Sequence, residues 1–355
     1  MHVRELDYDL PDELVAQHPA PERDGARLLV LDRDLGAVTH SAIRDLPSLL
    51  RPALWVVNDT RVIPTRVFAH KPSGGRVELL LVERVGEAGT RERWRAIGRA
   101  SKPLRAGASL RADGGAMEIT IRERAADGSL ELELAADEPI ERVLERIGHV
   151  PLPPYVRRPD TPEDRARYQT VFAARAGAIA APTAGLHFTP RLVEELESRG
   201  HRFARVTLHV GLGTFAPVKV ERLEEHAMHV ERYEIGEDAA RAIDAARADR
   251  MPVVAVGTTV VRTLESAAIG DGRVESGAGA TALFIRPPYD FRVVDAMLTN
   301  FHLPRSTLLA LVMAFAGVAE VRRAYAEAVR ARYRFFSYGD AMLIRDARTR
   351  AGAVP

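Results

Sequence analysis

The sequence predicts an α/β protein into which a small β-barrel is inserted. Short apolar strands and helices alternate in the first sixty residues and again from about residue 150 to the end, which is the pattern of an α/β layer domain. Between these segments the pattern changes to short strands separated by Gly-containing turns. We therefore expect a discontinuous α/β domain of residues 1–65 and 150–355 and an inserted β-barrel domain of residues 66–149.

The strands of the first segment and of the insertion follow from apolar and alternating patterns. Residues 27–32 and 37–41 flank a turn at Asp34-Leu35-Gly36, and residues 54–57 form a short buried strand that ends in Asn58-Asp59-Thr60-Arg61. Four strands are expected in the insertion, at residues 77–82, 93–97, 117–122 and 130–134.

Helices and buried strands alternate in the carboxyl-terminal part. Thr161-Pro162 supplies an N-cap and a first helical residue, and another helix begins near Pro190. The apolar run at residues 252–256 is a buried strand, which Gly257-Thr258-Thr259 turns into a helix. Before these elements, a helical pattern at residues 139–147 follows the last strand of the insertion.

Composition limits the class of protein. With 355 residues and 46% hydrophobic content, the chain can bury a sizeable core. The absence of Cys removes disulfides, thiolate metal sites and cysteine nucleophiles, and it fits a reducing compartment. The chain start has no apolar run of signal-peptide length, and no later stretch stays uncharged long enough to span a bilayer. We expect a cytoplasmic protein with no membrane partner.

The charge pattern leaves a polyanionic partner open. The net charge is only +1, but Arg supplies nearly all of the positive charge, and its planar fork suits phosphates and stacked bases. Two stretches are candidates for contact with nucleic acid, namely the Arg-rich residues 91–105 and residues 332–340, where aromatics interleave with arginines. The alternatives are a solvated strand face for the first stretch and a packed helix end for the second.

Two segments rich in small residues and His are candidates for a reaction centre. Residues 178–190 combine small residues and two prolines with His187, so a ligand could approach the backbone closely. The alternative is a tight turn capped by Thr189. In the second segment, residues 207–215, His209 stands beside a single Gly-x-Gly. Because the third Gly and the following helix of a dinucleotide fingerprint are absent, no Rossmann site is expected.

Two further segments could hold ions. Residues 225–231 carry His226, His229 and two carboxylates, which are possible metal ligands. Their i, i+3 histidine spacing differs from that of the zinc hydrolases, so hydrogen-bonded polar positions are favoured over a metal site. Gly257-Thr258-Thr259 lies where a strand meets a helix start, and together with Arg262 it could hold a carboxylate or phosphate. Ordinary capping by Thr258 is the alternative.

These motifs, in this order, resemble the S-adenosylmethionine:tRNA ribosyltransferase-isomerase family of queuosine biosynthesis. The resemblance covers nearly the whole chain. The matching motifs lie at residues 9–11, 18–19, 58–64, 73–75, 148–155, 168–172, 181–188, 207–215, 226–229, 255–262, 299–304 and 333–341.

The resemblance implies a reaction and its partners. The ribosyl group of S-adenosylmethionine would be transferred to 7-aminomethyl-7-deazaguanine at the wobble position of tRNA and isomerised, which gives epoxyqueuosine-tRNA and releases adenine and methionine. S-adenosylmethionine is then a co-substrate, and the second partner is the anticodon region of a tRNA. The resemblance also implies a monomer, a barrel-like core in the α/β domain, and neither metal nor prosthetic group.

The chemistry of this reaction suggests roles for particular residues. The sulfonium acidifies the adjacent C5′ protons, so a base is needed, and histidine is the natural candidate. His187 or His209 is the candidate base or proton shuttle, and Asp340 or His302 could give a proton to the departing adenine. The candidate substrate-binding residues are Asn58, Thr60, Arg61, Pro182, Thr183, Gly185, Phe188, Gly211, Gly213, Thr214, Phe215, His226, Gly257, Thr258, Thr259, Arg262, Asn300, His302 and Tyr338.

Two other classes of protein compete with this interpretation. A metal-dependent hydrolase would use His226 and His229 as its first ligands, and a non-catalytic module would only bind RNA. Neither class explains the concentration of His and Gly motifs in the α/β part as well as an enzyme does.

Overall fold

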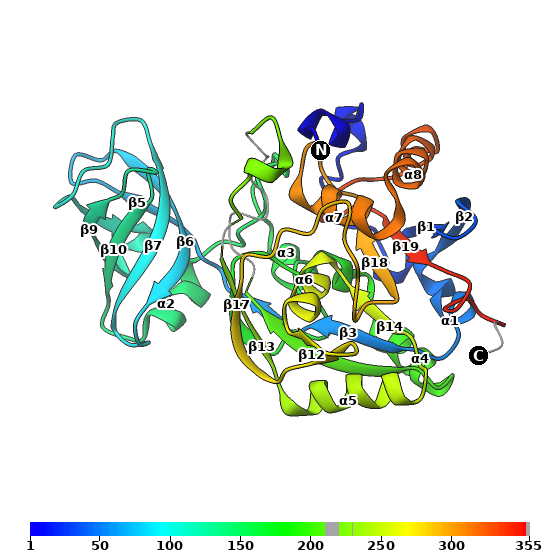
Figure 1. Ribbon diagram of the computed structural model, residues 1–355. Coiled ribbons are helices and arrows are strands. Elements are labelled where there is room, and N and C mark those ends of the chain that lie inside the picture. Colours follow the sequence, from blue (N-terminus) through cyan, green and yellow to red (C-terminus); the bar gives the residue numbers. More distant parts are fainter. Residues whose placement is uncertain (210–219, 229, 353–355) are drawn as a thin grey trace.

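A computed structural model describes residues 1–209, 220–228 and 230–352 of the chain. It consists of a larger part built on one sheet and a smaller part that is a closed barrel (Figure 1). The fold class expected from the sequence, α/β with an inserted β-barrel, is confirmed.

The larger part is built on an open sheet. In order across the sheet, its strands are β17 (Gly277–Thr281), β13 (Glu231–Ile235), β12 (Arg202–Leu208), β3 (Leu54–Asn58), β14 (Val253–Val256), β18 (Ala296–Asn300), β19 (Ala341–Arg345), β1 (Arg27–Asp32) and β2 (Ala37–Ala42). Strands β12, β3, β14 and β18 are parallel, whereas β19 is antiparallel to β18. The core of this part is therefore a nine-stranded sheet with edges at β17 and β2, where a barrel-like closure was expected.

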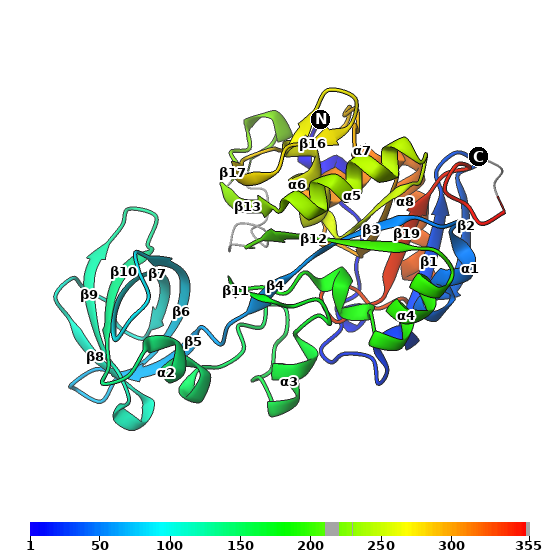
Figure 2. The ribbon, with the colours of Figure 1, turned by 90° about the horizontal axis from the view of Figure 1, so that it is seen from below.

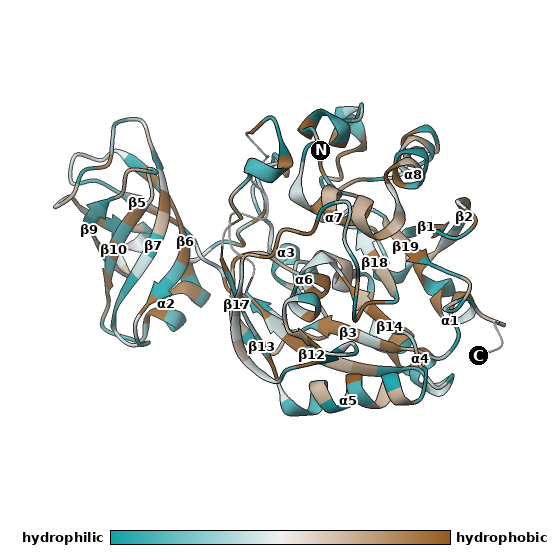
Figure 3. Ribbon diagram, viewed as in Figure 1, coloured by the Kyte–Doolittle hydropathy of each residue, from teal (hydrophilic) through white to brown (hydrophobic). Residues whose placement is uncertain are grey.

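The central strands are apolar because helices cover both faces of the sheet. Strands β3 and β14 are buried along their whole length, which is typical of parallel strands between two layers and explains their unbroken apolar runs (Figure 3). Residues of one face pack against α5 (Glu237–Ala248), α6 (Thr258–Ser266), α7 (Thr307–Ala316) and α8 (Val318–Arg330). Residues of the other face pack against α1 (Leu46–Leu49) and α4 (Pro190–Ser198).

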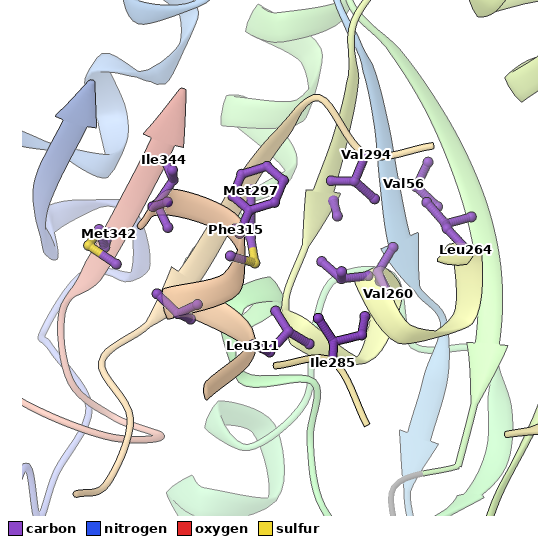
Figure 4. Close-up of a cluster of buried hydrophobic side chains, with 14 of the residues drawn as sticks. Val56, Val260, Leu264, Ile285, Val294, Met297, Leu311, Phe315, Met342 and Ile344 are labelled. Atoms are coloured by element: carbon purple, nitrogen blue, oxygen red, sulfur yellow. The ribbon is translucent and has the colours of Figure 1, made fainter. Parts of the chain in front are cut away.

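The larger of these two cores joins the helices to alternate residues of the strands. Val56 of β3 and Met297 of β18 point to the same side as Val260 and Leu264 of α6 (Figure 4). Phe315 of α7 packs into the same cluster. Because α6 begins directly after β14, this packing fixes where the first turn of α6 lies relative to the sheet.

The smaller part is a six-stranded antiparallel barrel (Figure 2). Its strands are β5 (Arg66–His70), β6 (Arg76–Val85), β7 (Arg91–Ala100), β8 (Ser109–Ala112), β9 (Glu118–Arg124) and β10 (Leu130–Ala135). Alternate residues such as Trp94 and Leu132 fill its interior, which explains the period-two pattern of the sequence. The barrel and α2 (Ile140–Ile147) lie within residues 66–149, and the exact domain boundaries stay a prediction.

Polar contacts join the two parts near the chain crossings. Arg66 and His149 exchange backbone hydrogen bonds where the chain enters and leaves the barrel. Arg61 forms ion pairs with Glu141 and Glu145 of α2, at 3.2 and 3.1 Å. These two ion pairs link the sheet part to the barrel part. They also engage the guanidinium of Arg61, which was a candidate substrate-binding residue.

A buried histidine supports the central strand of the sheet. The Nδ1 atom of His201 accepts hydrogen bonds from Nε1 of Trp55 and from the backbone N–H of Ala53, both at 3.1 Å. Burial lowers the pKa of His201 to about 4, so the imidazole is neutral near pH 7. Protonation of Nδ1 would break both hydrogen bonds.

We expect the free energy of unfolding to fall as the pH is lowered from about 6.5 towards 4. The unfolded chain takes up a proton on His201 near its ordinary pKa of about 6.5, whereas the folded chain does so only near pH 4. The stabilisation is thus complete above pH 6.5 and is lost at lower pH, at about 1.4 kcal/mol per unit of pKa difference. Urea unfolding followed by Trp fluorescence at several pH values measures this change.

His201→Gln tests the origin of the effect. This variant should show a shallower fall in unfolding free energy between pH 6.5 and 4, while His70→Gln, on the exposed barrel surface, is the matched control. Equal slopes for wild type and His201→Gln would show that His201 is not the source.

Candidate functional site

Each of the four parallel strands is followed by at least one polar residue where it ends at one edge of the large sheet. His209 follows β12, Asp59 and Thr60 follow β3, Gly257-Thr258-Thr259 follows β14, and Phe301-His302 follows β18. Ligands of open α/β sheets bind outside the carboxyl ends of their strands. Segments far apart in the sequence therefore meet at the edge where a ligand site is expected.

A cavity of about 270 Å³ lies at the carboxyl ends of β14 and β18. Seven of the residues singled out from the sequence line it, namely Pro182, Thr183, Gly257, Thr258, Thr259, Asn300 and His302. Other lining residues were not singled out as site residues, among them Tyr155, Ser306, Phe336 and Ser337. Most of the lining is apolar, so the few polar groups in it should decide how a ligand is oriented.

Two helices begin at the wall of this cavity. Gly257 is the N-cap of α6 with φ 93° and ψ 154°, a conformation that is essentially restricted to glycine. Ser306 is the N-cap of α7, where its side chain accepts a hydrogen bond from the N–H of Leu309 at 3.2 Å. Helix starts carry partial positive charge, so the two together favour an anionic group. Since Gly257 occupies the cap position of α6, Thr258 is not the cap residue.

His302 is held firmly at the cavity wall. Its Nε2 atom lies 2.8 Å from Oγ1 of Thr299. Its backbone carbonyl accepts a hydrogen bond from the hydroxyl of Tyr8 at 2.5 Å, and its backbone N–H donates to the hydroxyl of Tyr325 at 3.0 Å. Burial lowers the pKa of His302 to about 3, so the ring is neutral near pH 7.

His187 lies behind the cavity rather than in its lining. It is buried in the 3₁₀ helix Thr183–His187, and burial lowers its pKa to about 4, although the nearby Asp340 acts in the opposite direction. Its Nε2 atom and Oδ1 of Asn300 are both buried without a hydrogen-bond partner among the described residues. The Nδ2 atom of Asn300 donates to the carbonyl of Phe336 at 3.0 Å. The Asn300 side chain nevertheless lies close enough to His187 to raise its pKa, so the two residues form one polar group behind the cavity wall.

Asp340 serves the packing of the chain rather than the cavity. Its carboxylate accepts hydrogen bonds from the Arg27 side chain, at 3.0 and 3.2 Å, and from the backbone N–H of Arg334 at 2.8 Å. These contacts occupy both carboxylate oxygens, and Asp340 does not line the cavity. Tyr338 is also committed elsewhere, because its hydroxyl donates to Asp164 at 2.7 Å.

The aromatic residues of segment 332–340 do not face solvent. Tyr333, Phe335, Phe336 and Tyr338 are all buried, so they offer no free surface for base stacking. For these aromatic residues the structure favours the packed alternative over base stacking, although the segment is not helical.

A second polar group lies at the ends of β12 and β3. Oγ1 of Thr60 lies 2.8 Å from Nδ1 of His209, and burial lowers the pKa of this histidine while Asp59 opposes the shift. Asn58 hydrogen-bonds the N–H and C=O of Leu208 and the N–H of Thr60, so its amide is used to hold the two strand ends together. Strand β3 separates β12 from β14, which places His209 roughly 10 Å from the α6 start, two strand spacings away.

Several other candidates lie away from the cavity. Arg262 is buried, forms an ion pair with Glu231 and does not line the cavity, while its Nη2 atom has no hydrogen-bond partner among the described residues. His226 packs against the ring of Phe284. Gly185 and Phe188 are buried beneath the cavity wall. Gly211, Gly213, Thr214, Phe215 and His229 lie outside the described residues.

The described residues contain neither a metal-binding group nor a membrane-spanning helix. Within residues 1–209, 220–228 and 230–352, no group of three or more His, Asp or Glu side chains is placed to hold a metal ion. In the same residues, no helix has the length and apolarity that crossing a membrane requires.

The sequence indicates the local structure of some of the other cavity residues but not their contacts. Ser306 precedes an apolar helix and is a favourable N-cap residue, so its position at a helix start was predictable. Tyr155 ends the Pro-rich segment 151–155, and its hydroxyl lies 2.6 Å from Oγ of Ser337, a residue 182 positions away. No local pattern predicts a contact of that kind.

Comparison with known proteins identifies the family of this chain. A family model described as "Queuosine biosynthesis protein" matches residues 3–344. This chain belongs to that family.

The relatives of this family member carry one name. The S-adenosylmethionine:tRNA ribosyltransferase-isomerase of Anaeromyxobacter sp. (strain Fw109-5) is 54% identical over 98% of this chain and 100% of its own length. The protein of the same name from Sorangium cellulosum (strain So ce56) is 53% identical over 97% and 99%. The family and the transferase class expected from the sequence are confirmed.

A solved structure supports the same placement. The crystal structure of S-adenosylmethionine tRNA ribosyltransferase from Thermotoga maritima matches with 38% sequence identity and a TM-score of 0.54, and the match covers 96% of this chain and 99% of that one. The architecture of a large sheet with an inserted barrel is therefore an architecture of the family.

We expect Gly257→Ala to destabilise this family member. The backbone at Gly257, with φ 93° and ψ 154°, costs a residue with a Cβ about 1–3 kcal/mol. Gly236 is the matched control, since it is the N-cap of α5 with φ −66° and has no heavy atom within 4 Å of an added Cβ. Urea unfolding of both variants should show the larger loss for Gly257→Ala. Equal losses would mean that the conformation of Gly257 is not constrained.

Proposed function

We propose that this chain transfers and isomerises the ribosyl group of S-adenosylmethionine onto 7-aminomethyl-7-deazaguanine at the tRNA wobble position. The products are epoxyqueuosine-tRNA, adenine and methionine. The observation that carries the proposal is the cavity at the carboxyl ends of β14 and β18, where a neutral histidine and two helix starts meet. The names of full-length relatives support it. The proposal includes a cytoplasmic monomer that uses no metal or prosthetic group.

The cavity suits the methionine end of S-adenosylmethionine. The starts of α6 and α7 and the hydroxyls of Thr258 and Thr259 offer hydrogen-bond donors to a carboxylate. This cradle needs no help from the buried Arg262. The apolar lining suits the methylene groups and excludes water from the reacting carbon.

His302 is the best-placed group to accept the C5′ proton. His302 lines the cavity, whereas His187 lies behind the cavity wall and His209 lies two strands away from β14, at the end of β12. If Oγ1 of Thr299 accepts from Nε2–H of His302 and donates to the carbonyl of Asn300, the lone pair of the ring is on Nδ1. We therefore assign the proton to Nε2 and the basic role to Nδ1.

The low pKa of His302 is compatible with this role. Burial disfavours an imidazolium when the cavity holds no other charge. Deprotonation of a bound sulfonium, however, turns the substrate into a neutral ylide at the moment when His302 becomes positive. The number of charges in the cavity does not change, so most of the burial penalty is already present in the substrate complex.

The remaining polar groups belong to the tRNA side of the reaction. Thr60 and His209 lie at the ends of β3 and β12, one and two strand spacings along the edge from β14, on the side nearer the barrel, where the modified base would enter. Asn58 fixes the two strand ends that carry them. His187 supports the cavity wall through Asn300.

Release of adenine and methionine tests the proposed function directly. Purified protein should release both from S-adenosylmethionine when tRNA carries the deazaguanine precursor, and it should release neither with tRNA that lacks the precursor. Binding of tRNA without consumption of S-adenosylmethionine would instead support a non-catalytic module. Loss of activity with a chelator, together with stoichiometric metal, would support a metal-dependent enzyme.

We expect His302→Gln to lower kcat for adenine release by about 10²–10⁴-fold, which is the usual contribution of a general base to the rate. Parallel variants His187→Gln and His209→Gln should lose less, because neither ring lines the cavity. Thermal unfolding of each variant checks that the protein is folded. A larger loss in kcat for His187→Gln or His209→Gln than for His302→Gln would contradict the assignment.

A further inference from the structure

The outward side of strand β7 has two halves with different charge balance. In the first half every outward arginine faces a glutamate of a neighbouring strand. Arg91 pairs with Glu133 at 2.6 Å, Arg93 with Glu131 at 3.5 Å, and Arg95 with Glu83 at 3.1 Å. This half is a solvated strand face whose charges are internally neutralised.

The second half has cations without such partners. Beyond Ile97, Arg99 on β7 and Lys102 and Arg105 in the loop that follows β7 have exposed side chains that form no ion pair among the described residues, and neither does Arg76 on the neighbouring strand β6. Strand register places Arg99 opposite Glu78 of β6, but Glu78 is itself 3.6 Å from Arg66. Two of the three lysines in the whole chain, Lys71 and Lys102, lie at this end of the barrel, joined by a 3.1 Å hydrogen bond from Nζ of Lys71 to the carbonyl of Lys102.

Apolar and aromatic side chains accompany these cations. The guanidinium of Arg76 lies 4.3 Å from the ring centroid of Phe68, which is only half-buried on β5. Ile97 is 40% exposed between the two halves of β7. Stacking on Phe68 holds the guanidinium of Arg76 in place and leaves its remaining edge to a ligand. We call Phe68, Arg76, Ile97, Arg99, Lys102 and Arg105 the basic face.

The strands that carry Phe68, Arg76 and Arg99 of the basic face, β5, β6 and β7, also reach the large sheet. Glu83, further along β6, is 3.9 Å from Arg232 of β13, and Phe68 contacts the ring of His149 at the chain crossing. In Figure 2, β6 is seen on the side of the barrel that is turned towards the larger part. An RNA stem whose loop enters the strand edge of the large sheet could thus extend along β5, β6 and β7.

We propose that the basic face binds the phosphate backbone of the tRNA substrate, with Arg76, Arg99, Lys102 and Arg105 as the contacting cations. This inference rests on the proposed function, because it takes tRNA as the substrate. Unpaired Arg and Lys side chains gain free energy when they replace the counterions of RNA. Arg91, Arg93 and Arg95 gain much less, because a phosphate would have to displace or approach a glutamate. The stretch 91–105 therefore divides at Ile97 into a structural half and a binding half.

Two charge-matched variants test the proposal. The first combines Arg99→Gln, Lys102→Gln and Arg105→Gln, and the second combines Arg91→Gln, Arg93→Gln and Arg95→Gln. Each removes three positive charges from one side of the barrel. The Kd for tRNA bearing the precursor is measured for wild type and both variants over a range of salt concentrations, with Trp94 fluorescence as the check that the barrel is folded.

The two triple variants should differ clearly. Since each lost phosphate contact lowers the slope of log K against log salt by about 0.7–0.9, the first variant should lose about two units of slope. At low salt it should bind at least about ten-fold more weakly, while the second variant keeps most of the wild-type slope. Equal losses in both variants would indicate a general charge effect and overturn the proposal, as would an unchanged slope in the first.

A parallel assay separates this proposal from the proposed function. Adenine release by the wild type with precursor tRNA establishes the reaction independently of the barrel. If the wild type releases adenine and the first variant binds tRNA like wild type, the proposal for the basic face fails and the proposed function stands. If the wild type releases no adenine, the proposed function fails whatever the binding data show.

Discussion

The parallel strands β12, β3, β14 and β18 are the constraint on which the site depends. Because helices cover both faces of the sheet, β3 and β14 are buried along their whole length, and polar residues gather where the parallel strands end. Parallel order brings the four ends to one edge. Asn58 then links the ends of β3 and β12 through its side-chain amide, which keeps Thr60 and His209 in register. Burial of the strands thus stabilises the sheet and confines the polar residues of the site to the edge where the strands end.

Burial also sets the protonation state of the histidines. His187 and His302 have lowered pKa values because each ring loses its water without gaining a carboxylate partner strong enough to compensate. Neutral rings can act as bases or acceptors towards a cationic substrate. They would also repel that substrate less than imidazolium ions would. Histidines held in apolar surroundings therefore suit the sulfonium of the proposed substrate.

The sequence was sufficient for the fold class but only partly for the site. Unbroken apolar runs marked β3 and β14, and alternation marked β7, because burial on two faces or on one leaves a direct trace in residue order. Gly257 and Pro182, which were separate candidates in the sequence, line one cavity, and only the fold shows that they meet. For Asp340, Arg262 and Arg61 the sequence could not show an ion-pair partner, since a charged residue in a motif looks the same whether a ligand or a distant side chain neutralises it. Their partners Arg27, Glu231 and Glu141 are far away in sequence, and only the fold shows them.

In the barrel, ion pairing rather than residue type distinguishes the structural arginines from those proposed to bind RNA. Strand β7 repeats Arg at every second position up to Arg95 and then again at Arg99, and the sequence does not distinguish these positions. The neighbouring strands do, because β10 and β6 present Glu133, Glu131 and Glu83 opposite the first three arginines and no unshared carboxylate opposite the fourth. A strand face that only needed solubility would gain by pairing all of its charges. Leaving one half unpaired, beside a half-exposed aromatic ring, costs stability through charge repulsion, and binding of a polyanion is the event that recovers that cost.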